Sequence, residues 1–147
     1  MNALDRLVGT WDLTMHHTST AEPIRGRETY RPILDGAFVE MHRVYHHPDF
    51  PDAIAILSET RSHTFDVRGV VRTFDHRLTD TGWASERPSG DEAFAQRQTV
   101  TFTTPDTADG TGEISHDDGR TWKLDFTIHL ERVSTDARPD PGVSRGG

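Results

Sequence analysis

The chain has 147 residues, carries a formal net charge of −8 and contains no cysteine. This length suits one domain with its own core, and the acidic balance argues against nucleic acid and anionic membrane surfaces as partners. The lack of cysteine excludes a disulfide framework, a thiolate metal site and a cysteine nucleophile. No apolar run approaches membrane-spanning length and no signal peptide is recognisable, so we expect a cytoplasmic protein.

Two alternating segments near the chain ends are the strongest structural signal. Residues 1–8 predict a short helical turn, and residues 9–15 (GTWDLTM) then alternate apolar and polar side chains. Residues 122–130 (WKLDFTIHL) do the same near the other end. This period of two is typical of a strand with one buried face. Strands of this kind at both ends of a domain can pair and close a barrel.

Further strand-like segments lie between these two, separated by turn signals such as Asp35-Gly36 and Asp118-Gly119. The predicted strands are 9–17, 24–33, 37–47, 53–58, 62–67, 70–78, 82–87, 93–103, 110–116 and 121–133. They indicate an all-β fold, an antiparallel up-and-down barrel of about eight to ten strands. We expect residues 1–133 to form this domain. Residues 134–147 lack periodicity and contain several Pro and Gly, which predicts a disordered tail.

Several short segments carry a family resemblance. Gly9-Thr10-Trp11 is similar to the Gly-X-Trp start of calycin barrels, which include lipocalins, fatty-acid-binding proteins and nitrobindins. Further matching segments occur in order at 34–39, 65–72, 94–97, 116–122 and 130–133. Together they make residues 4–133 resemble bacterial lipocalin-like proteins of the DUF1579 type. The resemblance implies an up-and-down barrel and says little about activity, because a fold does not determine a function.

The apolar residues of each strand predict which side chains face inward. For 37–47 we prefer the set that starts at Val39 over the alternative set of Phe38, Glu40, His42, Val44 and His46. The expected inward residues are Trp11, Leu13, Met15, Glu28, Tyr30, Val39, Met41, Arg43, Tyr45, His63, Phe65, Val67, Val70, Arg72, Phe74, His76, Leu78, Phe94, Gln96, Gln98, Val100, Phe102, Trp122, Leu124, Phe126, Ile128 and Leu130.

Several polar residues of this inward set would be costly to bury without partners, so they predict a cavity with a small ligand. The residues suited to acid–base chemistry are Glu28, His63, Arg72 and His76. The expected ligand contacts are Tyr30, Met41, Arg43, Tyr45, Phe65, Phe74, Trp83, Phe94, Gln96 and Gln98. Arg72 requires an anion, which either Glu28 or a ligand oxygen can supply.

The preferred functional prediction is binding of a small, partly apolar molecule with a polar or anionic group. One alternative is a cofactor-independent cyclase or isomerase in a bacterial biosynthetic pathway. Another is a haem- or metal-binding barrel, since nitrobindin-type barrels hold haem through a C-terminal His. Here the alternation points His129 outward, and we expect neither a metal nor a cofactor. A structural interaction module is the fourth reading, and homodimerisation is left open.

Overall fold

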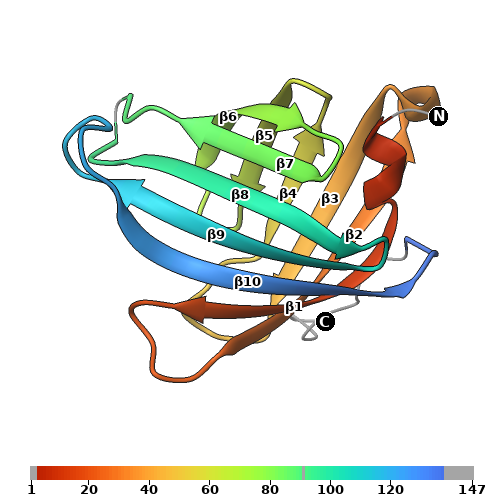
Figure 1. Cartoon of the computed structure of the whole chain (residues 1–147), viewed down its shortest axis with the longest axis horizontal. Coiled ribbons are helices and arrows are strands. Elements are labelled where there is room, and N and C mark those ends of the chain that lie inside the picture. The colour runs from red at the N-terminus through yellow and green to blue at the C-terminus, as the bar shows by residue number, and fades with distance from the viewer. Residues whose placement is uncertain (1–2, 91, 138–147) are drawn as a thin grey trace.

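The computed structural model describes residues 3–90 and 92–137, and these form a closed barrel of ten antiparallel strands (Figure 1). Each strand pairs with its sequence neighbours, and the first strand pairs with the last. The elements are η1 (Ala3–Leu7), β1 (Gly9–His17), β2 (Ile24–Ile33), η2 (Leu34–Gly36), β3 (Phe38–Tyr45), β4 (Ala53–Leu57), β5 (Arg61–Asp66), β6 (Val71–Leu78), β7 (Gly82–Arg87), β8 (Ala95–Thr104), β9 (Thr107–Ser115) and β10 (Lys123–Ser134). The predicted up-and-down barrel is confirmed. No helix among these described residues is long and apolar enough to cross a membrane.

Closure of the barrel depends on the two terminal strands, as their alternation predicts. Trp11, Leu13 and Met15 are buried on β1, while Asp12 between them is exposed. β1 lies beside β10 (Figure 1). In their register Leu13 is opposite Leu130. The apolar faces of both strands therefore point to the same interior.

The N-terminal helical turn closes one end of the barrel. Leu4 and Leu7 of η1 are almost fully buried, and the indole Nε1 of Trp11 donates to the Leu7 carbonyl over 2.9 Å. The Arg132 guanidinium lies 4.3 Å from the centre of the Trp11 ring and donates to the carbonyls of Val8 and Arg6. These contacts tie the turn to β1 and β10.

The predicted phase of β5 is wrong. Ser62 is buried, and Thr64 and Asp66 line the interior with it. His63 is exposed and Phe65 is 44 % exposed, so both point outward, as does Val67 in the following turn. The prediction failed because the apolar residues of this strand lie on its outer face, where Phe65 pairs with two other apolar residues, Ile54 and Val71.

The inward row of β10 is also shorter than predicted. The β9–β10 register shifts between Leu124 and Phe126, which makes Asp125 an extra residue and leaves Leu124 51 % exposed. Trp122 precedes the strand, and its ring lies 4.2 Å from the guanidinium carbon of Arg97. From Phe126 onward the row points inward as predicted.

The last strand, β10, ends at Ser134, one residue beyond its predicted end. The Thr10 hydroxyl donates to the Asp136 carbonyl over 2.6 Å, so the first residues of the predicted tail contact β1. The remainder of that tail, residues 138–147, lies outside the described residues.

Candidate functional site

A cavity of about 490 Å³ lies inside the barrel. Leu7 and Leu13 line it near the end that η1 closes. At the opposite end it reaches the β3–β4 and β5–β6 connections, where Phe50 and Arg68 contribute to its wall. Its volume lies in the range of small-molecule sites, and its wall combines apolar side chains with three groups of polar ones.

The first polar group joins β2 to β3. Glu28 is 3 % exposed, and its carboxylate accepts hydrogen bonds from Arg43 Nε at 2.6 Å and from the Tyr30 hydroxyl at 2.9 Å. Burial and the Glu28 charge raise the pKa of Tyr30 well above its ordinary value, so its hydroxyl keeps its proton. Burial also raises the pKa of Tyr45, whose ring lies 5.7 Å from the Arg43 guanidinium carbon. This group satisfies its own charges.

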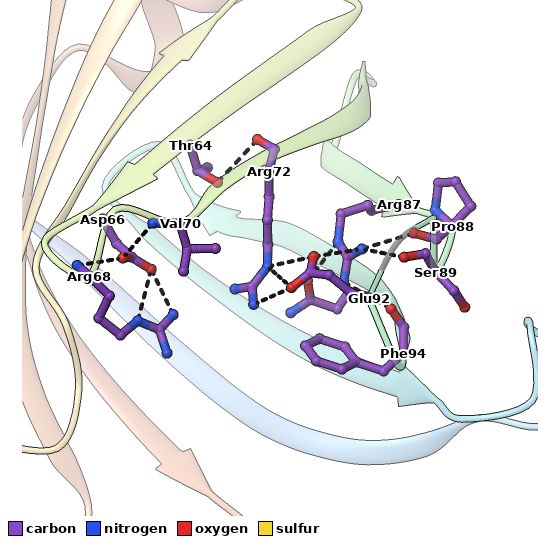
Figure 2. A network of polar contacts seen from close by, with 11 residues as sticks. Thr64, Asp66, Arg68, Val70, Arg72, Arg87, Pro88, Ser89, Glu92 and Phe94 are labelled. Atoms are coloured by element: carbon purple, nitrogen blue, oxygen red, sulfur yellow. Dashed lines mark hydrogen bonds and ion pairs between the residues drawn. The ribbon is translucent and has the colours of Figure 1, made fainter.

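The second group brings two arginines to one carboxylate (Figure 2). Arg72 of β6 donates to Glu92 from Nε and from Nη2, the latter over 2.8 Å. Arg87 of β7 forms an ion pair with the same carboxylate at 3.0 Å. The Phe94 ring lies within contact of both cations, at 5.4 Å from Arg72 and 5.2 Å from Arg87. The hydrogen bond from Arg72 and the charges of both arginines lower the pKa of Glu92.

The two arginines play different structural parts. Arg87 is only 6 % exposed, and it also donates to Gln96 and to the carbonyls of Pro88, Ser89 and Phe94. Burial, together with the nearby Arg72 cation, lowers the pKa of Arg87. Arg72, by contrast, lines the cavity, with its side chain 20 % exposed. Of the two, Arg72 is therefore the one placed to contact a ligand.

Arg68 lies beside this group, in the β5–β6 turn (Figure 2). Its guanidinium donates twice to Asp66, at 2.6 and 3.2 Å, and this pairing raises the pKa of Arg68 and lowers that of Asp66. Elsewhere on the cavity wall His17 pairs with Asp125 at 3.1 Å. The Arg68–Asp66 pair balances its own charge.

The third group consists of His76 on β6 and Ser85 on β7. His76 is 4 % exposed, and its Nδ1 lies 3.0 Å from the Ser85 hydroxyl. Its Nε2 is buried and has no hydrogen-bond partner among the described residues. Burial lowers the pKa of His76 to about 4, so the imidazole is neutral at pH 7.

Most of the predicted site residues share the cavity wall. The predicted inward phase is confirmed for β2, β3, β6 and β8, including the ambiguous strand β3. The predicted site residues that line the cavity are Glu28, Tyr30, Met41, Arg43, Tyr45, Arg72, Phe74, His76, Trp83, Phe94, Gln96 and Gln98. His63 and Phe65 are the two that point outward, and the His63 ring instead contacts Thr73 on the outer surface at 3.1 Å.

Sequence reasoning missed Glu92, Arg87 and the Asp66–Arg68 pair. Glu92 lies in the β7–β8 connection, where no alternation assigns a side chain to either face. Arg87 ends β7, and counting by twos from Trp83 would have placed it inward. Asp66 was missed because the predicted phase of β5 placed its side chain on the outer face.

His129 points outward as predicted, and Asp109 and Glu131 contact its ring nitrogens at 2.7 and 3.1 Å. Its hydrogen bonds to these carboxylates raise its pKa. The C-terminal histidine that the haem alternative needs is therefore outside the barrel. The described residues also contain no group of three or more His, Asp or Glu side chains that could hold a metal ion.

No family model matches the chain, and no curated protein matches its sequence. Among solved structures, the barrel is similar to the S-type phycobiliprotein lyase CPES from Guillardia theta. The TM-score is 0.53 at 13 % identity, over 88 % of this chain and 89 % of that one. At this identity the likeness concerns the fold, and it agrees with a lipocalin-like barrel.

Proposed function

We propose that the barrel binds a small, partly apolar molecule that carries an anionic group, with this anion against Arg72. The observation that carries the proposal is the sharing of Glu92 by Arg72 and Arg87. Two guanidinium groups on one carboxylate leave a surplus positive charge at the cavity wall. Such a surplus favours an anion, most strongly where water is largely excluded.

The other arginines on the cavity wall support Arg72 as the anion-binding residue, because each of them has a carboxylate of its own. Arg43 has Glu28 at 2.6 Å, Arg68 has Asp66 at 2.6 Å and Arg97 has Glu113 at 2.8 Å, so each is balanced by one carboxylate. Apolar side chains on the cavity wall would pack against the rest of the ligand. They include Met15, Met41, Phe74, Trp83, Phe94 and Phe126.

A matched pair of fluorescent probes tests the proposal. Anilinonaphthalene sulfonate and phenylnaphthylamine share one ring system, and only the first carries a charge. We expect Arg72→Met to weaken sulfonate binding by about tenfold and to leave phenylnaphthylamine binding nearly unchanged. Arg77→Met is the control, because Arg77 lies on the same strand and is exposed. Equal effects of Arg72→Met on both probes would contradict the proposal.

A cofactor-independent cyclase or isomerase is the second candidate, favoured by the unpartnered Nε2 of His76, which could accept a proton from a bound substrate. Chemical conversion of a bound ligand that is lost in His76→Phe would support it. We also propose that the protein is bacterial and cytoplasmic, belongs to the DUF1579 type and can form a homodimer.

A further inference from the structure

We propose that His76 and Ser85 form a second polar subsite, which binds a hydroxyl or carbonyl group at the end of the ligand opposite its anion. This inference rests on the proposed function, which places the anion at Arg72. It names the ligand class more closely, as an elongated apolar acid with a neutral polar group at its far end.

The unpaired nitrogen of His76 is the first observation. A buried polar atom without a hydrogen bond is destabilising, and native structures rarely leave a buried polar atom without a partner. Nδ1 of this ring is occupied by Ser85, while Nε2 has no partner in the described part of the chain. His76 lines the cavity but Nε2 itself is buried, so a bound molecule can supply the missing partner once the ring turns or a neighbouring side chain moves to open Nε2 to the cavity.

The chemistry of the pair selects a neutral group. The Ser85 hydroxyl can either donate to Nδ1 or accept from it, so Nε2 can act as an acceptor or as a donor. A hydroxyl fits both tautomers, and a carbonyl fits the one in which Nε2 carries the proton. Burial keeps the pKa of His76 near 4, so the ring presents no cation at pH 7. A second carboxylate would therefore gain little there.

The spacing along β6 sets the shape of the ligand. Arg72, Phe74 and His76 are alternate residues, and all three line the cavity. Strand geometry places the first and third about 13 Å apart at their Cα atoms. A ligand that reaches both polar groups must cross the Phe74 ring, so its middle is apolar.

The test uses octanoate, decanoate and dodecanoate, each beside its ω-hydroxy counterpart, in displacement of bound phenylnaphthylamine. In the wild-type protein we expect that, at one of the three chain lengths, the ω-hydroxy acid binds more tightly than the plain acid. In His76→Phe this preference should fall by about tenfold, the change expected for one hydrogen bond. His63→Phe is the matched control, because His63 also contacts a hydroxyl but points outward.

A second measurement does not depend on a folded variant. Nitrogen NMR of histidine-labelled wild-type protein should show a shift of the His76 Nε2 resonance with the hydroxy acid and none with the plain acid. An equal hydroxyl preference in wild type and His76→Phe, or an unmoved Nε2 resonance, overturns the inference. A different result would contradict the proposed function itself. In that case Arg72→Met would leave the affinity for the plain acids unchanged.

Discussion

At the scale of single residues, the pairing of charges decides what the cavity can bind. Arg72 needs an anion, and two candidates follow from the sequence, Glu28 and a ligand. The structure pairs Glu28 with Arg43 and supplies Glu92 to Arg72 instead. Because Arg87 shares Glu92, this carboxylate occupies the place where a ligand anion would be most strongly attracted.

Removing the Glu92 charge tests this interpretation. In Glu92→Gln, Arg72 and Arg87 lose their shared counter-ion, so we expect anilinonaphthalene sulfonate to bind more tightly. We also expect the free energy of unfolding to fall by about 1–3 kcal/mol, because buried Arg87 loses an ion pair. Probe titration and denaturant unfolding measure the two effects. Weaker sulfonate binding in a folded variant would show that Glu92 supports the site rather than competing for it.

At the scale of elements, the inward row differs from the predicted one where a strand bulges or where its apolar residues lie on its outer face. The bulge at Asp125 turns Leu124 outward and starts the inward row at Phe126. The Phe126 ring lies against Gly112 of β9, where a Cβ atom would come within 2.2 Å of it. Gly112 therefore leaves the space in which this ring lines the cavity.

The substitution Gly112→Ala tests whether the contact between Gly112 of β9 and Phe126 of β10 positions this ring in the cavity. The added methyl group must displace the Phe126 ring, and overpacking of this kind costs about 1–3 kcal/mol. We expect lower stability in denaturant unfolding and weaker phenylnaphthylamine binding, because the ring moves within the cavity. Thr111→Ala, at the exposed neighbouring position, should change neither by much. Unchanged affinity for phenylnaphthylamine in Gly112→Ala would show that Phe126 does not contribute to ligand binding.

At the scale of the whole molecule, one end of the barrel is closed by η1 and the cavity reaches the other. Arg132 near the end of β10 connects the parts of the closed end. Its side chain is 13 % exposed, and it contacts Trp11, the carbonyls of Val8 and Arg6, and Asp106. These contacts join the N-terminal turn to the last strand.

Arg132→Met should consequently destabilise the whole barrel. The N-terminal carbonyls lose a charged donor, so we expect the free energy of unfolding to fall by about 2–4 kcal/mol, with one cooperative transition. Arg31→Met is the control, because Arg31 pairs with Glu40 at an exposed position where water screens the charges, so we expect little change in stability. Similar losses in the two variants would mean that Arg132 does not anchor the closed end.

The sequence by itself determined the barrel and most of the inward rows, because alternation of side chains is a local property of an extended backbone. It correctly placed Arg72, Phe74 and His76 on one face of one strand. It could not place His63, Phe65 or Leu124, because the face that a strand buries depends on its register with its neighbours. The partners of the charged groups were decided by tertiary structure alone. Glu92 reaches Arg72 from a connection 20 residues away in sequence, and no local pattern encodes that contact.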